Sequence, residues 1–355
     1  MRTGILGYPQ SGKTTLFNVL AHAHAPTGGF ASAAGGINVG TIAVPDPRLE
    51  ALRDLFQPKK YTPAQIEYVD LAGPPGGKDD AAALLPAQIT TADVLLVVVR
   101  AFEDSAVHHP KGSIDAERDL REFQDELVLK DLAILEGRAN RLRKAAQVGQ
   151  KDAKEELPLL ERCLARLEDG HPLRDEEFTD DEDRRLRGYG LVTARPLLVV
   201  FNVGEDRVQG AGFAEAIARR PHTTALEICG KAEMEIAELP DDEAEEFMEL
   251  LGISESSVAR VIRSSYELLG FRSFFTVSKA EVRAWNITAG TPAVRAAGKV
   301  HSDLERGFIR AEVIPSADLL EAGGWSEAKA QNRVRVEGKE YEVVDGDVFH
   351  VRFSV

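Results

Sequence analysis

A glycine-containing run near the start of the chain holds the residues whose types and spacing most clearly allow chemistry. It reads Gly7-Tyr8-Pro9-Gln10-Ser11-Gly12-Lys13-Thr14 and fits the pattern G-x-x-x-x-G-K-[ST]. In such a run the backbone N–H groups cradle phosphates, the lysine reaches the outer phosphate oxygens, and the hydroxyl binds Mg²⁺. The pattern therefore predicts a site for a nucleoside triphosphate and Mg²⁺. Its predicted contacts are Gly7, Pro9, Gln10, Ser11, Gly12, Lys13, Thr14 and Thr15.

The flanks of this run have the secondary structure that phosphate binding needs. An apolar run that ends at Ile5-Leu6 predicts a strand, and the stretch from Thr15 to Leu20 predicts the start of a helix. The phosphates would then lie at a helix N-terminus, where free N–H groups and the helix dipole favour negative charge. The alternative is a turn that fits the pattern by chance, and the strand and helix on its two sides disfavour it.

A second group of candidates follows a strand predicted over Ile66–Val69. Asp70 and Gly73 form the string D-x-x-G. A carboxylate at this end of a parallel strand can hold Mg²⁺, and the Gly73 amide can approach the γ-phosphate. Many GTPases place a glutamine next, which orients the attacking water. This chain has Pro74 there, so either another group activates the water or hydrolysis is slow.

A third group follows a strand predicted over Leu197–Phe201. Guanine-binding proteins use N-K-x-D at this place, and this chain has Asn202-Val203-Gly204-Glu205. Valine in place of lysine changes the side chain that stacks on the base, and glutamate in place of aspartate changes the reach of the carboxylate. Both changes weaken guanine recognition and favour adenine. The string Cys229-Gly230-Lys231 comes where a loop at the base edge is expected. The predicted base-side residues are Asn202, Val203, Glu205, Cys229, Gly230 and Lys231.

The strands that position these groups predict an α/β fold. The runs at residues 94–99 and 196–201 are almost continuously apolar, as expected of strands that are buried on both faces of a parallel sheet. Between them, residues 117–187 have helical periodicity and high charge. Two antiparallel helices joined near residues 147–150 would bury their apolar stripes against each other, as a hairpin inserted into the nucleotide domain. Additional helices that cover the sheet are the alternative.

The composition limits the class of protein. The chain has 355 residues and a net charge of −15, which argues against coating nucleic acid by bulk attraction but allows a local basic face. Cys163 and Cys229 have no spacing typical of a disulfide framework or a zinc site. No apolar run is long enough to cross a bilayer. We therefore expect a cytoplasmic protein without a membrane partner, and the sequence predicts no oligomeric state.

The C-terminal part has a different sequence pattern. Its short runs of alternating apolar and polar residues predict a small α+β domain. We expect strands at residues 274–277, 284–287, 308–313, 341–344 and 348–353. Basic residues in this part are candidates for contact with RNA, and Trp285 and Phe308 are candidates for stacking on bases. Burial of these two aromatic side chains in the domain core is the favoured alternative.

Together these strings resemble the Obg-like ATPases of the YchF type, within the translation-factor-related P-loop GTPases. The resemblance covers essentially the whole chain. Its motifs are Gly12-Lys13-Thr14-Thr15-Leu16-Phe17-Asn18, Val44-Pro45-Asp46-Pro47-Arg48-Leu49, Asp70-Leu71-Ala72-Gly73, Asn202-Val203-Gly204-Glu205, Tyr266-Glu267-Leu268-Leu269-Gly270, Phe274-Phe275-Thr276-Val277, Glu281-Val282-Arg283-Ala284-Trp285, Gly307-Phe308-Ile309-Arg310-Ala311-Glu312 and Asp345-Gly346-Asp347-Val348.

The resemblance implies a Ras-like P-loop sheet over residues 1–118 and 190–270, a helical coiled-coil insertion over 119–189, and a TGS-like β-grasp domain over 271–355. It also implies Mg²⁺-dependent hydrolysis of ATP in preference to GTP, association with ribosomes, and a regulatory role in translation or stress. RNA contact through the TGS-like domain and the helical arm would fit this role. Thr14 and Asp70 would hold Mg²⁺, and Lys13 and His109 are the candidate catalytic residues. An exposed loop position without a catalytic role is the alternative for His109.

The chain departs from the family pattern at the phosphate end. The family has Pro-Asn-Val-Gly-Lys, whose asparagine helps to bind a monovalent cation in related GTPases, and this chain has Gln10-Ser11 there. A requirement for potassium therefore stays open. The first switch loop, at residues 30–36, lacks the expected threonine, and the second, at residues 74–78, begins with two prolines. A slow ATPase switch on the ribosome and a nucleotide-holding RNA- or protein-binding module with little hydrolysis are the two alternatives.

Overall fold

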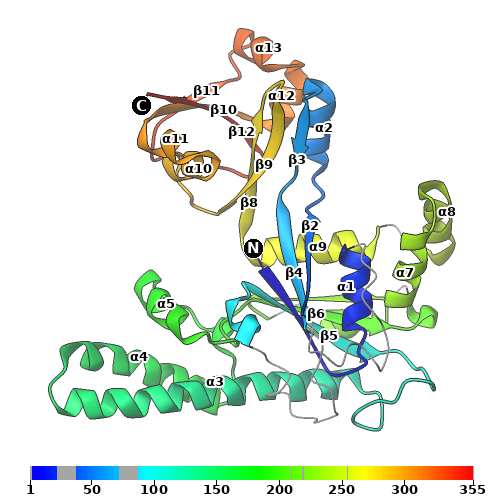
Figure 1. Cartoon of the computed structure of the whole chain (residues 1–355), viewed down its shortest axis with the longest axis vertical. Helices are drawn as coiled ribbons and strands as arrows, with labels where there is room; N and C mark the ends of the chain where they lie inside the picture. The colour runs from blue at the N-terminus through cyan, green and yellow to red at the C-terminus, as the bar shows by residue number, and fades with distance from the viewer. Residues whose placement is uncertain are drawn as a thin grey trace. The chain divides into compact units, whose positions relative to one another are not determined.

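The computed structural model describes residues 2–21, 37–71, 87–208, 210–217, 220–253 and 255–354 (Figure 1). Its contacts divide the chain into two compact units. The first contains Met1–Ile42 and Glu67–Leu268, and the second contains Ala43–Ile66 and Leu269–Val355. The chain thus leaves the first unit after Ile42 and returns to it at Glu67.

The first unit is built on a six-stranded sheet with the order β2-β4-β1-β5-β6-β7. Strand β1 pairs in parallel with β4 and β5, and β6 pairs in parallel with β5 and β7. Every residue of β5 and β6 is buried, which explains their unbroken apolar sequences. The four predicted strands, β1, β4, β5 and β6, are therefore confirmed, and β2 and β7 are strands that the sequence analysis did not predict. The bounds of the six strands are β1 Arg2–Leu6, β2 Ile37–Ala43, β4 Gln65–Leu71, β5 Val94–Ala101, β6 Leu197–Val203 and β7 Thr223–Ile228.

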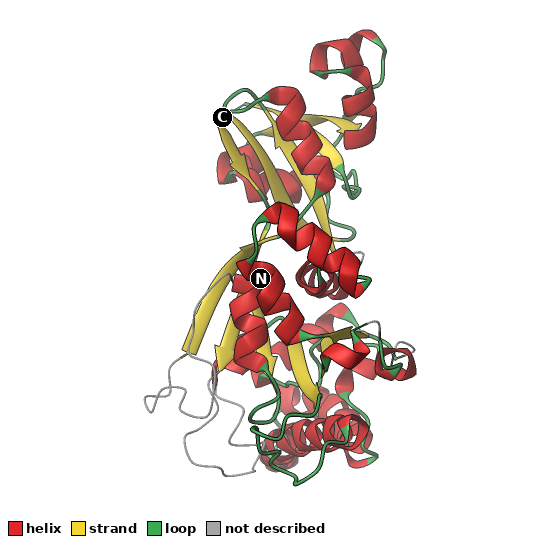
Figure 2. Ribbon diagram, turned by 90° about the vertical axis from the view of Figure 1, so that its right-hand side faces the viewer, coloured by secondary structure: helices red, strands yellow, loops and turns green. Residues whose placement is uncertain are grey.

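Helices lie along this sheet (Figure 2). Helix α1 follows the phosphate loop directly and buries Leu16, Phe17 and Leu20. Helix α9 lies against the sheet, where the Tyr68 hydroxyl of β4 donates to Ser265 Oγ at 3.1 Å. The helices other than the arm are α1 Lys13–Ala21, α6 Phe213–Ile217, α7 Gly230–Glu238, α8 Asp241–Leu251 and α9 Ser257–Leu268.

A helical arm is inserted between β5 and β6. It consists of α3, Ala116–Gln147, and α4, Lys151–Glu168, which run antiparallel and are joined by a turn at residues 148–150 (Figure 1). The first turns of α3 pack on the sheet core through Leu120, Phe123 and Leu127, whereas its distal part packs against α4. The first turns of α3 therefore cover the sheet, as one predicted alternative has it, and its distal part forms the predicted hairpin with α4.

The base of the arm is fixed by a buried carboxylate. Asp131 accepts hydrogen bonds from the backbone N–H groups of Val192 and Thr193 and from the Thr193 hydroxyl. These residues directly precede β6, so α3 is joined to the strand that carries Asn202. A short helix α5, Asp180–Leu186, begins with a capping box between Thr179 and Glu182.

The second unit has its own six-stranded mixed sheet, with the order β11-β10-β12-β8-β9-β3. Strands β8 and β9 are antiparallel, as are β10 and β12, whereas β12 runs parallel to β8 and β3 parallel to β9. The strands are β3 Lys60–Thr62, β8 Phe271–Val277, β9 Glu281–Thr288, β10 Phe308–Pro315, β11 Arg335–Glu337 and β12 Asp347–Phe353. The helices are α2 Pro47–Phe56, α10 Ala293–Val300, α11 Ser302–Arg306, α12 Ser316–Ala322 and α13 Trp325–Ala330.

Two details of this unit differ from the sequence-based expectation. Residues 341–344 form no strand and make only an isolated bridge between Pro292 and Glu342, while Val343 is buried in the core. The expected strand is wrong because a turn closed by the Val344 N–H and the Asp347 carboxylate interrupts the run. The segment Ala43–Ile66 belongs by contacts to this unit, although it lies within the predicted range 1–118. The three-part division by residue number stays a prediction.

The two aromatic candidates for base stacking have internal partners. Phe308 is 4% exposed and belongs to the core. Trp285 stacks on Phe274 with the rings 6.4 Å apart, and its indole N–H donates to the Thr276 hydroxyl. The Arg283 guanidinium lies 3.9 Å from the Trp285 ring centroid. The burial of Phe308 and the ring contacts of Trp285 agree with the core alternative.

Candidate nucleotide site

The phosphate loop lies between β1 and α1, and its shape depends on two glycines. Gly7 and Gly12 both have positive φ angles, +138° and +100°. A Cβ atom on Gly7 would lie 2.3 Å from the Val98 carbonyl oxygen, and one on Gly12 would lie 2.1 Å from Asn202 Nδ2. The Val98 carbonyl of β5 and the Asn202 side chain of β6 thus lie too close to these two positions to leave room for a side chain. Only glycine fits at either position.

Lys13 reaches back across this loop from the first turn of α1. Its ammonium group donates to the carbonyl oxygens of Gly7 at 2.9 Å and Tyr8 at 2.7 Å. Burial lowers the pKa of Lys13 to about 8, against the opposing attraction of the Asp70 carboxylate. The cation is therefore held above a helix N-terminus, where both charges favour a bound phosphate.

Thr14 and Asp70 meet next to this cation. The Thr14 hydroxyl donates to Asp70 Oδ2 at 3.0 Å, and Asn38 Nδ2 donates to the same oxygen at 3.3 Å. Asp70 is fully buried, and its Oδ1 has no hydrogen-bond partner in the part of the chain that the structure describes. A buried oxygen without a donor suits a hard cation or one of its water ligands. Sequence reasoning missed Asn38, which no motif marks and which only the position of β2 brings next to β4.

This donor set fits Mg²⁺. The cation usually takes one or two protein ligands, and the phosphates and waters complete the shell. Among the described residues, no three His, Cys, Asp or Glu side chains are grouped as a metal site. One carboxylate and one hydroxyl would hold Mg²⁺ together with a triphosphate, and the ion would there neutralise charge on the phosphate oxygens.

The predicted base-side residues divide into two groups. Asn202 is buried, and its amide donates to the Ser11 carbonyl oxygen and accepts from the Gly230 N–H, both at 3.0 Å. It therefore ties the phosphate loop to the start of α7, where Thr15 lies against Gly230. The side chains of Val203 and Cys229 are 2% and 4% exposed and pack in the sheet core, so they do not join this group.

Glu205 and Lys231 form the exposed part of the base side. Lys231 Nζ lies 2.8 Å from Glu205 Oε2. Hydrogen bonding to Glu205 raises the pKa of Lys231, so the ammonium stays charged. Glu205 follows β6 and Lys231 lies in the first turn of α7, which follows β7, and the parallel sheet brings these two positions to one edge.

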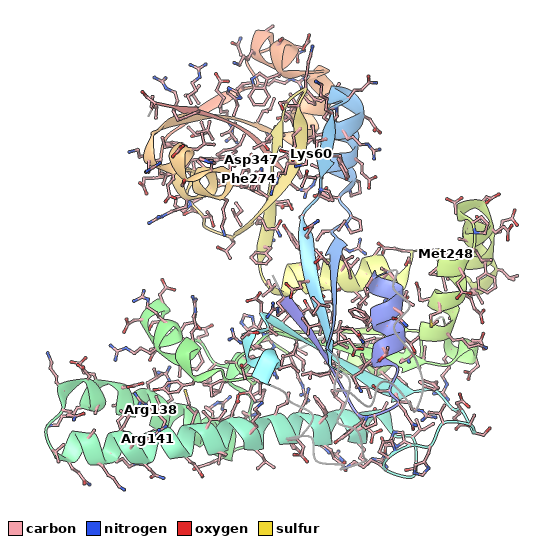
Figure 3. The ribbon with its side chains drawn as sticks, viewed as in Figure 1. Lys60, Arg138, Arg141, Met248, Phe274 and Asp347 are labelled. Carbon is pink, nitrogen blue, oxygen red and sulfur yellow. The ribbon has the colours of Figure 1, made fainter. Side chains whose placement is uncertain are left out.

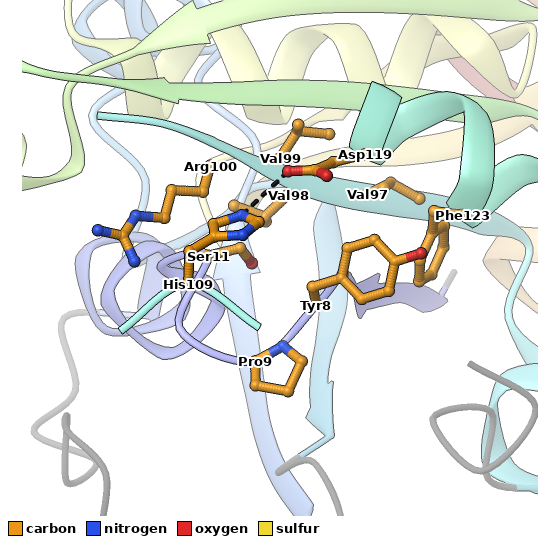
Figure 4. A pocket seen from close by; sticks show the side chains of 11 residues that line it. Tyr8, Pro9, Ser11, Val97, Val98, Val99, Arg100, His109, Asp119 and Phe123 are labelled. Carbon is orange, nitrogen blue, oxygen red and sulfur yellow. Dashed lines mark ion pairs between the residues drawn. The ribbon is translucent and has the colours of Figure 1, made fainter. Parts of the chain in front are cut away.

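His109 lies beside the phosphate loop in a small pocket (Figure 4). Its side chain is 6% exposed, its Nδ1 accepts from the Lys111 N–H at 3.1 Å, and its Nε2 lies 3.0 Å from Asp119 Oδ2. The last contact is electrostatic, since that oxygen has no aligned hydrogen bond. Burial lowers the pKa of His109 and outweighs the opposing effect of Asp119. Both ring nitrogens are thus engaged within the protein, so His109 is not the exposed loop residue that the alternative expected, and its catalytic role stays a prediction.

Arg100 holds the loop that carries His109, and sequence reasoning missed it. Its guanidinium donates to the carbonyl oxygens of Phe102, Asp104 and Val107 and lies 4.6 Å from the Phe102 ring centroid. The residue is 3% exposed and has no carboxylate bonded to it among the described residues. A single arginine inside an apolar run of β5 was the available signal.

Tyr8 joins the phosphate loop to the arm. Its ring meets Phe123 of α3 edge-on, with centroids 5.7 Å apart, and the Lys111 ammonium lies 5.2 Å from the Tyr8 ring centroid. Burial, reinforced by Glu122 and Glu126, raises the pKa of Tyr8 to about 12. The x positions of the motif thus include a residue with a packing role that the pattern alone does not indicate.

The remaining predicted residues are less constrained. Pro9 lines the pocket with His109, and Gln10 is exposed with a φ of +61°. Gly73, Pro74 and both predicted switch segments, residues 30–36 and 74–78, lie outside the described residues.

Comparison with known proteins decides the family. The chain is 40% identical over 364 residues to the Ribosome-binding ATPase YchF of Bacillus subtilis (strain 168), and the match covers 100% of both chains. The chain belongs to the YchF family of Obg-like ATPases. The Obg-like ATPase 1 of Caenorhabditis elegans is a more distant member, 33% identical over 100% of this chain and 92% of its own length.

The YchF fold is also matched by a solved structure and by two family models. The Schizosaccharomyces pombe YchF GTPase superposes with a TM-score of 0.83 over 99% of this chain and 97% of its own, at 27% identity. A model described as "50S ribosome-binding GTPase" matches residues 2–136, and a YchF C-terminal model described as "Protein of unknown function (DUF933)" matches residues 271–354. The expected fold class, a P-loop α/β sheet with a helical insertion and a C-terminal domain, is confirmed. Within the described residues of this YchF chain, no helix has the length and apolar character needed to cross a bilayer.

Proposed function

We propose that this chain is a Mg²⁺-dependent ATPase of slow turnover that acts as a ribosome-associated switch in translation or stress, in the cytoplasm. The observation that carries the proposal is the meeting of Lys13, Thr14 and Asp70 at one end of the sheet, where a cation, a hydroxyl and a buried carboxylate fit Mg²⁺-triphosphate. The similarity to ribosome-binding ATPases and to the 50S ribosome-binding GTPase family supports ribosome association.

The preference for ATP over GTP rests on the Glu205 and Lys231 pair. Guanine is recognised by a carboxylate that accepts from both N1 and N2, and this needs both oxygens. One oxygen of Glu205 already faces the Lys231 ammonium at 2.8 Å. The other can accept from a single amino group, such as N6 of adenine, while GTP remains a weaker ligand.

Slow turnover follows from the environment of His109. A general base has to reach the water that it activates, and both nitrogens of His109 are engaged by Lys111 and Asp119. Hydrolysis with His109 as the catalytic residue requires the ring to leave Asp119. The same observation favours a second candidate function, a nucleotide-holding module that binds RNA or protein with little hydrolysis.

Two measurements test the proposal. The first is a competition titration of labelled ATP analogue against ATP and GTP, with Lys13→Ala as the test variant and Lys59→Ala, at an exposed lysine, as the control. Lys13→Ala should abolish binding, and retained affinity would exclude the site.

The second measurement is single-turnover release of phosphate with and without purified ribosomes. Release that ribosomes accelerate supports the switch. No release in either case supports the module instead, provided that the nucleotide still binds.

A further inference from the structure

We propose that the tip of the helical arm is an RNA-binding element that contacts the phosphates of ribosomal RNA. The tip is defined as residues 138–154, which span the end of α3, the connecting turn and the start of α4. This inference rests on the proposed function, because it assigns the contact surface for the ribosome.

The charge of the tip is opposite to that of the whole chain. The tip holds six basic residues and one acidic residue, in a protein whose net charge is −15. Both flanking parts of the arm are acidic. The basic residues are Arg138, Arg141, Arg143, Lys144, Lys151 and Lys154, and Asp152 is the acidic one.

Three of the six cations have no ion pair among the described residues, and a fourth has only a long one. Arg141, Lys144 and Lys154 are exposed and make no ion pair within the described part of the chain. Lys151 is 87% exposed at its side chain, and its nearest carboxylate oxygen, on Glu155, is 3.8 Å away. Arg138, labelled with Arg141 in Figure 3, and Arg143 are the exceptions, since Arg138 bonds to Glu156 and Tyr189 and Arg143 bonds to Glu161 at 3.1 Å.

Helix stability accounts for only part of this charge. Lys144 in the last turn of α3 is favourable there, because the dipole is negative at that end. Lys151 and Lys154, close to the start of α4, lie at the positive end of the dipole, where cations are unfavourable. Its N-cap, Gln150, makes no side-chain capping bond. The N-terminal N–H groups of α4 therefore add to the positive potential of the tip. Asp152 is the one acidic residue in this first turn.

The arrangement of the cations favours RNA over a flat or single-sided partner. On α3, Arg141 and Lys144 lie on the side opposite the buried Leu135, Ala139 and Leu142. On α4, Lys151 and Lys154 likewise lie away from the residues that pack against α3. Since the two outer sides face apart, a partner that contacts all four cations has to surround the end of the hairpin. Folded RNA does this with phosphates at its surface.

The test uses the full-length protein with Arg141, Lys144, Lys151 and Lys154 all changed to glutamine. The control variant changes Arg121 of α3 and Arg184, Arg185 and Arg187, in and directly after α5, to glutamine. These are exposed residues outside the tip, and the variant has the same change in net charge. Affinity for purified ribosomes and for protein-free ribosomal RNA is measured over a series of salt concentrations. Labelled ATP analogue binding and thermal melting are measured on each variant, and a third variant with Arg141→Lys, Lys144→Arg, Lys151→Arg and Lys154→Arg keeps the charge.

The tip variant should bind ribosomes and ribosomal RNA at least tenfold more weakly, and its log–log salt slope should fall by about 3 for four phosphate contacts. The control and charge-keeping variants should bind like the wild type, and all variants should retain nucleotide affinity. Wild-type affinity and slope in the tip variant would overturn the inference and leave the proposed function standing. Loss of ribosome binding without loss of RNA binding would also overturn it, in favour of a ribosomal protein. If the wild type binds neither probe, ribosome association itself fails.

Discussion

The Thr14 hydroxyl donates to Asp70 Oδ2 across 3.0 Å and thereby joins the first turn of α1 to the end of β4. The two residues are 56 positions apart, and each belongs to a different sequence motif. Asn38 reaches the same oxygen from β2. Asp70 Oδ1, which has no hydrogen-bond partner among the described residues, is thus held in a fixed orientation by α1, β2 and β4.

Replacing Asp70 by asparagine tests the Mg²⁺ role of this oxygen. The shape stays almost the same and the charge is lost, so we expect Mg²⁺-dependent ATP affinity to fall at least tenfold, which corresponds to about 1.4 kcal/mol. Titration of labelled ATP analogue with and without Mg²⁺ measures the effect. Asp54→Asn, at an exposed carboxylate, is the control. An equal Mg²⁺ effect in wild type and Asp70→Asn would exclude Asp70 from the metal site.

Nucleotide affinity should depend on pH through Lys13. The pKa of this ammonium is lowered to about 8 in the free protein, and a bound phosphate raises it. The Lys13 contribution to affinity is therefore complete below pH 8 and is lost as pH rises above it, and binding near pH 8.5 takes up protons. Calorimetry between pH 7 and 9.5 in buffers of different ionisation enthalpy measures the uptake. Lys13→Arg should show a flat profile over this range, and persistence of the proton uptake in that variant would assign it to another group.

Base selectivity should change when Lys231 is replaced by alanine. The substitution frees Glu205 Oε2, and the carboxylate can then accept from two donors of guanine. We expect the ratio of ATP to GTP affinity to fall severalfold, as measured by competition titration. Glu235→Ala is the matched control, because Glu235 is a more distant neighbour of the same ammonium, at 4.0 Å. An unchanged ratio would show that the pair does not select the base.

Arg100 should contribute strongly to stability. Arg100→Ala leaves three loop carbonyl groups without their donor and opens a cavity, so we expect a loss of about 1–3 kcal/mol in the free energy of unfolding. Arg100→Lys should recover little, because an ammonium cannot reproduce the planar fork. Urea unfolding measures both variants, with the exposed Arg121→Ala as the control. A loss below about 0.5 kcal/mol, typical of surface changes, would contradict the role of Arg100 in holding the loop.

Stability should also fall in mild acid through His109. Its pKa is lower in the folded state than the usual 6.5, so the unfolded chain binds the proton more readily. The free energy of unfolding is unaffected by this group well above pH 6.5 and decreases as pH falls below it. Urea unfolding at pH 7.5 and 5.5 measures the change. His109→Gln should reduce the dependence on pH, whereas His108→Gln should leave it intact.

The sequence was sufficient to predict four strands of the first unit's sheet, β1, β4, β5 and β6, and the two helices of the arm, but not the outer strands β2 and β7. Continuous apolar runs have one stable placement between two layers of helices, and helical periodicity over residues 117–187 determines which side of each helix is buried. The expected strand at residues 341–344 failed because its apolar residues are buried by a turn that Asp347 closes, and burial alone does not distinguish a turn from a strand.

The candidate site was predictable where a motif links residue type to chemistry, as at Lys13, Thr14 and Asp70. Residues with neighbours distant in the sequence were not predictable. Asn38 bonds to Asp70 only because β2 lies next to β4, and the roles of Tyr8 and Arg100 depend on α3 and on the loop after β5. Val203 fits a base-binding string, but β6 is buried along its whole length and the Val203 side chain packs in the sheet core.

The unbroken course of α3 has a mechanical consequence. A helix of 32 residues is about 48 Å long at about 1.5 Å per residue. Its first turns touch the nucleotide loop through the contact between Tyr8 and Phe123. A tilt of about 5° at that end of a rigid rod of this length displaces the far end by about 4 Å. A small displacement of the Tyr8 ring that tilts α3 would therefore move the tip of the arm by more than the length of a hydrogen bond.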